Sequence, residues 1–379
     1  MMNKKIVTVF HNEIEVGKLG WSDNRSIIFQ YAPSWVENGF PLSPFCLDLT
    51  FDVYDFKNLY ELDGVSGCFY DSLPDQWSYI LLKKYLRKKG IDYDSLNTLE
   101  KLTYRPKNSV GSLNYLPCKS EEFNLLKQDE LDDIFIKTQR ILNDEEIESF
   151  DELFKLGSSS GGSRPKIDLN INGENYIVKF PNTHDMKNMG KMEFDYMSTA
   201  KKCGIIIPEI RLFPSKICSG YFGIKRFDIK DNKKSYVISA SSLLNKNPFT
   251  TVFTYKNLFK ITSIMTNSSL KDIEQLYRIM VFNYLANNQD DHAKNFSFIY
   301  NEDLRRWQLS PAYDLTLSHT QYGEHQILVG NKGSGVTKDD LINEAIGFGL
   351  KKELLLEIYN EIKTIASENL KSYLSKIGG

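Results

Sequence analysis

The chain has 379 residues, of which 41% are hydrophobic and 25% are charged, and its formal net charge is −2. This length and composition are typical of a folded protein of two domains or two lobes, and they exclude a disordered chain. A net charge so close to zero also argues against a chain that binds nucleic acid or anionic membranes through its overall charge.

The cysteines and the N-terminal segment indicate the cellular compartment. The cysteines are odd in number and widely spaced, so they suggest neither a zinc site nor a disulfide framework; they are Cys46, Cys68, Cys118, Cys203 and Cys218. Lys4 and Lys5 lead directly into a strand-like segment, and no apolar stretch is long enough for a signal peptide or a membrane span. We therefore expect a cytoplasmic protein with reduced cysteines and no membrane contact.

Residues 1–118 form the first predicted unit, which is rich in β-structure. Alternating apolar residues predict strands at 6–10, 15–19 and 26–31. Pro74 and Asp75 then precede an amphipathic run that ends in Lys and Arg before Gly90. These start and stop signals predict a helix at 76–89.

Residues 119–237 form the second predicted unit. Connecting helices are expected up to residue 156, and a loop of Gly and Ser follows at 157–163. Asn172-Gly173 is a strong hairpin-turn dipeptide and joins two predicted strands. The elements expected in this part after the Gly/Ser loop are strands at 164–171, 174–180, 209–213 and 221–227 and a helix at 192–203.

The third unit, residues 238–379, is predicted to be mainly helical. Residues 273–286 are apolar nearly all round, which predicts a buried helix. A polar segment at 287–295 follows it, and strands are expected at 296–300 and 306–309. A polar loop between a buried helix and a hairpin is a rigid platform for a functional site.

Within that loop, Asp290 and Asn295 have the spacing of the catalytic loop of protein kinases, in which Asn follows Asp by five positions. We expect Asp290 to accept the proton of a substrate hydroxyl and Asn295 to hold a metal ion and bind ATP. Lys294 would neutralise the transferred phosphoryl group. His292 would lie at the ATP site and would orient the loop by hydrogen bonding. The neighbouring Asp291 lies only four positions before Asn295, so it does not have this spacing.

Partners for this loop occur elsewhere in the chain, in the order found in kinases. Asp314 follows the predicted hairpin, where a second Mg²⁺ ligand would lie. Lys179, in an apolar strand, needs an anionic partner, which ATP phosphates would supply, and Glu193 would orient it. The Gly/Ser loop precedes them and would cradle phosphates through its N–H groups, with Lys166 as a second contact.

Each of these signals has a structural alternative when it is taken alone. The polar loop is also typical of a solvated helix end, Asp314 of an ordinary turn and Lys179 of an exposed edge strand. The Gly/Ser loop matches neither of the common phosphate-binding patterns, so a flexible linker is its alternative. The shared order favours the kinase interpretation. It predicts an α+β protein with a two-lobed, protein-kinase-like fold, a small β-rich N-terminal subdomain and a mainly helical C-terminal lobe.

The chain resembles the HipA-type serine/threonine kinases, which are the toxins of bacterial toxin–antitoxin pairs. The segments that match this family are 41–43, 73–77, 110–113, 159–166, 176–181, 225–228, 288–297, 309–315 and 329–332. The resemblance implies a nucleotide loop of Gly161, Gly162, Ser163, Arg164, Pro165 and Lys166. It also implies an adenine-binding hinge of Lys225, Arg226 and Phe227, which binds largely through its backbone. Ser159 aligns with a serine that such kinases autophosphorylate, and its neighbours Ser158 and Ser160 leave the modified residue open.

The resemblance further implies the biological role. It predicts ATP and Mg²⁺ as cofactors, a translation protein such as an aminoacyl-tRNA synthetase as substrate, and a small helix-turn-helix antitoxin as partner. DNA would be contacted indirectly, through that antitoxin. Two alternatives stay open at this point: a small-molecule kinase, and an inactive pseudokinase that acts as a binding module in a repressor complex.

Overall fold

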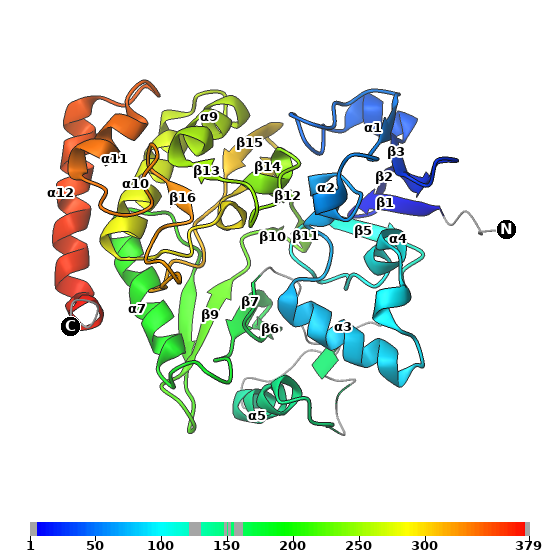
Figure 1. Ribbon diagram of the computed structural model, residues 1–379, viewed down its shortest axis with the longest axis horizontal. Coiled ribbons are helices and arrows are strands. Elements are labelled where there is room, and N and C mark those ends of the chain that lie inside the picture. Colours follow the sequence, from blue (N-terminus) through cyan, green and yellow to red (C-terminus); the bar gives the residue numbers. More distant parts are fainter. Residues whose placement is uncertain (1–5, 121–129, 148–149, 151–152, 155–161, 376–379) are drawn as a thin grey trace.

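The computed structural model describes residues 6–120, 130–147, 150, 153–154 and 162–375. In Figure 1 the β-rich N-terminal part, blue to cyan, lies on the right, and helices α9 to α12 lie on the left. A second sheet, in green, lies between them, close to α7. The architecture is α+β, as the sequence predicts.

The N-terminal sheet has strand order β4-β3-β2-β1-β5 and is antiparallel throughout. Its strands are β1 (Val7–His11), β2 (Ile14–Trp21), β3 (Ile27–Tyr31), β4 (Val53–Asp55) and β5 (Leu113–Leu116). The strands predicted at 6–10 and 15–19 are confirmed and pair as a hairpin, with Val7 opposite Leu19. Asn12 turns the chain with φ 53°, a left-handed conformation that Asn tolerates well. Strands β4 and β5 were not predicted.

The described N-terminal part also contains four short to medium helices. They are α1 (Pro33–Asn38), α2 (Gly67–Tyr70), α3 (Gln76–Lys88) and α4 (Thr98–Leu102), with short 3₁₀ helices at Tyr60–Leu62 and Tyr93–Ser95. The buried side chains of α3 pack with those of two strands in the second sheet, β6 (Lys166–Ile171) and β7 (Glu174–Lys179). The helix predicted at 76–89 is confirmed to within one residue. Asp75 caps α3 because its carboxylate accepts a hydrogen bond of 2.8 Å from the N–H of Ser78.

The second sheet has strand order β6-β7-β9-β8 and holds the predicted strand lysine. Its strands are β6 (Lys166–Ile171), β7 (Glu174–Lys179), β8 (Ile210–Phe213) and β9 (Tyr221–Lys225), with helices α5 (Leu131–Leu142) and α7 (Met189–Lys202) in the same part of the chain. Asn172 and Gly173 have φ of 53° and 87°, as a two-residue hairpin turn requires. Lys166 and Lys179 are therefore paired at the open end of this hairpin.

The C-terminal part is mainly helical, as predicted. Its helices are α8 (Ala240–Leu243), α9 (Tyr255–Met265), α10 (Leu270–Leu285), α11 (Lys338–Ala345), α12 (Lys352–Asn369) and α13 (Lys371–Leu374). Its strands are β10 (Ile229–Lys230), β11 (Lys233–Lys234), β12 (Val237–Ser239), β13 (Phe253–Thr254), β14 (Ser297–Asn301), β15 (Arg306–Leu309) and β16 (Ile327–Leu328). The sheet β12-β14-β15 supports the polar loop between α10 and β14. In the described part of the chain, no helix has the length and apolar content needed to cross a bilayer.

A buried ionic network joins the N-terminal part to the end of β9. The guanidinium of Arg226 donates to Asp228 at 2.7 Å and 3.0 Å and to the carbonyl of Ser109 at 3.0 Å. Asp228 also accepts the N–H of Gly111 at 2.8 Å. Arg226 and Asp228 are 4% and 1% exposed. The loop before β5 is thereby attached to the segment predicted to bind adenine.

Candidate active site

Lys179, at the end of β7, lies between two carboxylates. Its Nζ is 2.5 Å from Oε1 of Glu193 on α7, and it also pairs with Oδ1 of Asp314. Burial alone would lower the pKa of Lys179, but Asp314 and Glu193 outweigh it and raise that pKa above its usual range. The structure therefore brings together three of the predicted residues, from a strand, a helix and a loop that are distant in sequence.

Asp290 lies in the loop that follows α10, which Asn287 opens with φ 55°. The side chain of Asn295 donates a 2.8 Å hydrogen bond to the carbonyl of Asp290, which closes the loop over a 3₁₀ turn at Ala293–Asn295. The carboxylate of Asp290 is 58% exposed. Partial desolvation nevertheless raises its pKa, and the nearby carboxylates of Asp314 and Asp291 add to this rise.

Asp291 has a structural environment that differs sharply from that of Asp290. Its side chain is fully buried. Its carboxylate accepts hydrogen bonds from Tyr255 Oη at 2.9 Å and from the N–H groups of Gln326 and Ile327 at 2.9 Å and 3.3 Å. Asp291 therefore attaches the loop after α10 to residues 326 and 327. Of the two neighbouring carboxylates, Asp290 is the one that a substrate can reach.

Among the described residues, the ring of His292 makes no hydrogen bond, so they do not confirm the expectation that it orients the loop in this way. Its Nε2 is 3.9 Å from Oδ1 of Asp290, which is too long for a hydrogen bond. Its buried Nδ1 has no hydrogen-bond partner among the described residues. The imidazole instead packs edge-on against the ring of Phe249, at 5.6 Å between ring centres.

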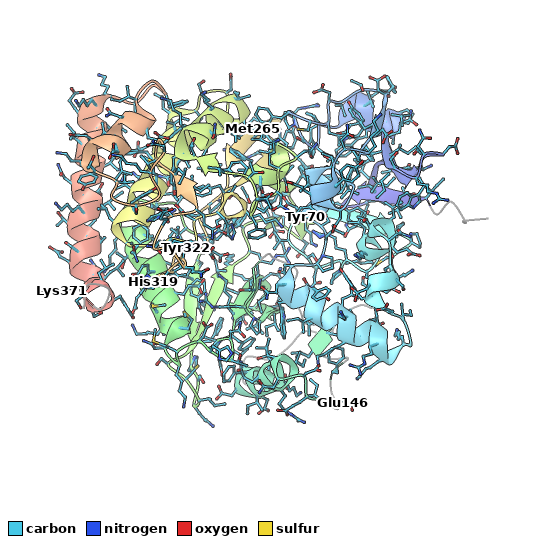
Figure 2. All side chains as sticks on the ribbon, viewed as in Figure 1. Tyr70, Glu146, Met265, His319, Tyr322 and Lys371 are labelled. Carbon is cyan, nitrogen blue, oxygen red and sulfur yellow. The ribbon has the colours of Figure 1, made fainter. Side chains whose placement is uncertain are left out.

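Lys294 contacts the N-terminal part of the chain. Its Nζ is 3.8 Å from Oδ1 of Asp71 and 5.0 Å from the ring centre of Tyr70. Tyr70, labelled in Figure 2, lies where the N-terminal part meets the loop after α10. The Oη of Tyr313 donates to the carbonyl of Lys294 at 2.7 Å. The N-terminal part therefore borders the candidate catalytic loop directly.

The predicted nucleotide loop is described only from Gly162 onward. Gly161 and Ser158 to Ser160, including the candidate phosphorylation site Ser159, lie outside the described residues. Gly162 and Ser163 are exposed, and Pro165 accepts the N–H of Phe180 at 2.8 Å. Arg164 donates to Asp185 at 2.8 Å.

Lys166 is buried and its ammonium group lies 3.2 Å from Oδ2 of Asp75, the residue that caps α3. Its Nζ also donates to the carbonyl of Gly162 at 3.3 Å. Burial alone would raise the pKa of Asp314, but the charge of Lys179 outweighs burial and lowers that pKa. The charge of Lys166 lowers it further. The nucleotide loop and Asp314 therefore share one electrostatic environment.

The predicted hinge follows β9. The ammonium of Lys225 pairs with Glu174, and the N–H groups of Lys225 and Arg226 donate to the carbonyls of Glu209 and Asn175, each at 2.8 Å. Those two N–H groups are therefore not free for a nucleotide. The ring of Phe227 stacks on that of Tyr313 at 5.9 Å. This stack links the hinge to the segment that contains Asp314.

The donor set fits a cation bound together with a nucleotide. In the described residues, no group of three or more His, Cys, Asp or Glu side chains could hold a metal ion by itself. Asn295 uses its Nδ2 for Asp290, which leaves its Oδ1 as an acceptor. A carboxylate and an amide oxygen suit Mg²⁺, which usually takes its remaining ligands from phosphates and water.

Sequence reasoning missed two residues that contact Asp290. The amide of Gln326 donates to Oδ1 of Asp290 at 2.7 Å, and the N–H of Asp290 donates to Oγ of Ser318 at 2.9 Å. Both come from the segment after Asp314, which has no periodic pattern. The only signal available was its run of polar residues.

Two family models match the chain. The model of the HipA-like C-terminal domain matches residues 158–369, and that of the HipA N-terminal domain matches residues 7–116. Among solved structures, the chain is similar to one from the Shewanella oneidensis MR-1 toxin antitoxin system HipA, HipB and its operator DNA complex. The TM-score is 0.70 and the identity 18%, over 97% of this chain and 90% of that chain. This likeness shows the fold.

Two curated proteins are also similar to the chain. The "Putative kinase Y4dM" of Sinorhizobium fredii is 28% identical over 233 residues, which are 55% of this chain and 54% of that protein. A "Putative kinase" of Haemophilus influenzae is 27% identical over 180 residues, or 42% of this chain and 52% of that protein. The chain thus spans about half the length of the curated relatives it matches.

Proposed function

The chain belongs to the HipA family, and on that premise we propose that it is an ATP- and Mg²⁺-dependent kinase that phosphorylates a serine or threonine of a protein. The observation that supports this best is the ammonium group of Lys179 between Glu193 and Asp314, on a side chain that is 15% exposed. A lysine held by a helix glutamate is ready to pair with phosphates, and the same contact brings a candidate Mg²⁺ ligand beside it.

The side chains divide the reaction among them. Lys179, with Lys166 and Arg164 nearby, would bind the phosphates of ATP. Asp290 would accept the proton of the substrate hydroxyl. The oxygen of that hydroxyl forms a bond to the γ-phosphorus of ATP, while the bond between this phosphorus and the leaving ADP breaks. Asn295 and Asp314 would hold Mg²⁺, which supplies charge neutralisation when it is bound.

The surroundings of Asp290 favour a protein substrate over a small molecule. The side chain of Asp290 is 58% exposed, and Phe249, beside His292, is 68% exposed. Small-molecule sites usually bury about 70–90% of their ligand. An open site with an exposed aromatic ring suits a hydroxyl on a protein segment.

The finer parts of the proposal rest on the family resemblance. We infer that the chain is the toxin of a toxin–antitoxin pair and phosphorylates a translation protein, such as an aminoacyl-tRNA synthetase. Autophosphorylation at Ser159, or at Ser158 or Ser160, would add about 1.5–2 negative charges near the phosphate site and repel ATP. A small helix-turn-helix antitoxin would be its partner and would make the DNA contacts. The net charge of −2 agrees with indirect DNA contact.

The proposal is tested with purified protein, γ-labelled ATP and a bacterial extract. We expect transfer of label to protein and loss of transfer when EDTA removes Mg²⁺. Label that reaches sugars or amines instead would indicate a small-molecule kinase. ATP binding without any transfer would indicate a binding module.

Lys179→Met is expected to weaken ATP binding by about 10- to 100-fold, because a charge-assisted contact to the phosphates is lost. Isothermal titration calorimetry with ATP measures this. Lys191→Met is the matched control, since Lys191 lies on the nearby helix α7, is 46% exposed and pairs only with its helical neighbour Asp195 among the described residues. Equal affinities of the two variants would contradict the assignment of Lys179.

A further inference from the structure

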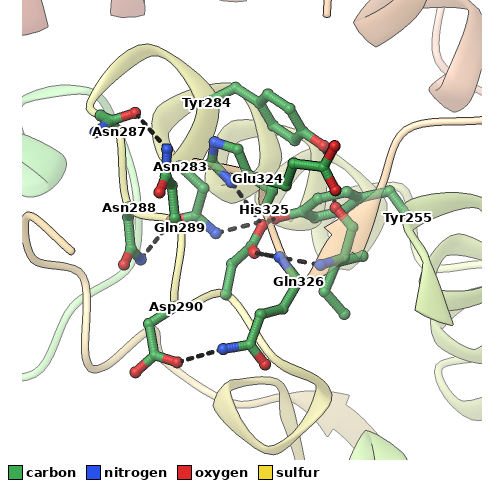
Figure 3. Close-up of polar contacts among 12 residues, drawn as sticks. Tyr255, Asn283, Tyr284, Asn287, Asn288, Gln289, Asp290, Glu324, His325 and Gln326 are labelled. Carbon is green, nitrogen blue, oxygen red and sulfur yellow. Dashed lines mark hydrogen bonds and ion pairs between the residues drawn. The ribbon is translucent and has the colours of Figure 1, made fainter. Parts of the chain in front are cut away.

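We propose that Gln326 is a positioning residue for Asp290, held in register by the buried carboxylate of Asp291; this inference rests on the proposed kinase function. Residues 290 and 326 come from different segments, the loop after α10 and the residues just before β16. Figure 3 shows the side chain of Gln326 directed at Asp290.

The backbone around Gln326 is attached to Asp291. The carboxylate of Asp291 accepts the N–H groups of Gln326 and Ile327, and the ring nitrogen Nδ1 of His325 lies 3.1 Å from its Oδ2. Tyr255 completes the set of contacts at 2.9 Å. Because Asp291 adjoins Asp290 in the chain, this attachment sets the distance between Asp290 and residue 326.

The side chain of Gln326 then contacts the reacting carboxylate. Its Nε2 lies 2.7 Å from Oδ1 of Asp290. A carboxylate only accepts hydrogen bonds, so the amide must present its NH₂ group here. The contact restrains Asp290 and occupies one oxygen, which leaves Oδ2 to accept a substrate hydroxyl.

The preceding part of the same segment is held by uncharged groups. Oγ of Ser318 donates to Oδ1 of Asn288 at 2.9 Å, and the N–H of Thr320 donates to Oε1 of Gln289 at 2.8 Å. Nε2 of Gln289 donates to the carbonyl of Gly323 at 3.0 Å. Gln326 is therefore presented to Asp290 by a segment that amides and hydroxyls hold in place.

Three variants test this in the full chain: Gln326→Leu, Gln326→Glu and the control Gln321→Leu, an exposed glutamine of the same segment. The contact itself is observed by NMR of the ¹⁵N-labelled side-chain amide of Gln326 at constant pH, with the signal identified by its loss in Gln326→Leu. We expect this signal to shift in Asp290→Asn, because the hydrogen bond to the carboxylate is changed, and to stay in place in Asp303→Asn, whose side chain is exposed in a distant turn.

Kinase assays complete the test. In Gln326→Leu and Gln326→Glu we expect kcat to fall about tenfold and the KM for ATP to stay unchanged, while Gln321→Leu matches the wild type. An amide signal of Gln326 that does not respond to Asp290→Asn, or a wild-type kcat in Gln326→Leu, would overturn the inference. If the wild type shows no phosphoryl transfer, the proposed function fails, while the amide signal still decides whether Gln326 contacts Asp290.

Discussion

Asp290→Ala is expected to lower phosphoryl transfer by about 10²–10⁴-fold, the usual contribution of a general base. The variant should still bind ATP, because the contacts of Lys179 with Glu193 and Asp314 do not involve Asp290. Label transfer from γ-labelled ATP measures the first effect and calorimetry the second. Intact mass with and without phosphatase, on wild type and variant, also shows whether the chain phosphorylates itself.

The control for this prediction is Asp303→Ala. Asp303 lies in the turn between β14 and β15, and its side chain is 82% exposed. Its removal should leave transfer unchanged. In the wild type, activity should decline as the pH falls through the raised pKa of Asp290, because the protonated carboxyl cannot accept a proton. Unchanged labelling by Asp290→Ala would rule out Asp290 as the base.

Arg226→Ala is expected to destabilise the fold by about 3–5 kcal/mol, since it leaves the buried carboxylate of Asp228 without its cation. Arg226 also donates to the carbonyl of Ser109, so the variant loses the attachment between the N-terminal part and the hinge. Urea unfolding, followed by circular dichroism, measures the change. Lys230→Ala is the matched control, because the ion pair of Lys230 with Asp303 is exposed and should contribute about 0–1 kcal/mol.

The effect of Arg226→Ala should depend on pH. Burial raises the pKa of Asp228, but Arg226 outweighs burial and lowers it below the ordinary value. The stability from this pair is therefore present above the pKa of an unfolded aspartate, about 3.9, and is lost as the pH falls through the lower folded value. The difference between variant and wild type should shrink below about pH 4. A constant difference would mean that lost packing, and not the charge of Asp228, causes the destabilisation.

Much of the fold was predictable because local patterns determine it. The turn at Asn172-Gly173 requires left-handed backbone that these residue types adopt readily, and the structure has it. The apolar periodicity of α10 and the capping signal at Asp75 are equally local. Strands β4 and β5 were missed because each is short and is stabilised by its neighbours in the sheet. The domain boundaries near residues 118 and 237 stay predictions.

The candidate site was predictable only in part. The residue types and their order suggested Lys179, Glu193, Asp290, Asn295 and Asp314, and the structure places them in one region; their roles stay predictions. Among the described residues, the ring of His292 makes no hydrogen bond and packs on Phe249, and the side chain that donates to the carboxylate of Asp290 is that of Gln326. Nothing in the sequence separates such a glutamine from other exposed glutamines, because its position depends on contacts over a long sequence separation.

Residue type and spacing alone were enough to predict the composition class, the kinase-like order of residues and the family resemblance. The environments of neighbouring groups could be seen only in the folded chain. The fold exposes Asp290 and buries its neighbour Asp291, and it places Arg226 in a buried ion pair with Asp228. It also brought Gln326 to Asp290. The physical reason is that burial and hydrogen bonding, which set the charge and the reach of a side chain, arise from segments that meet only when the chain has folded.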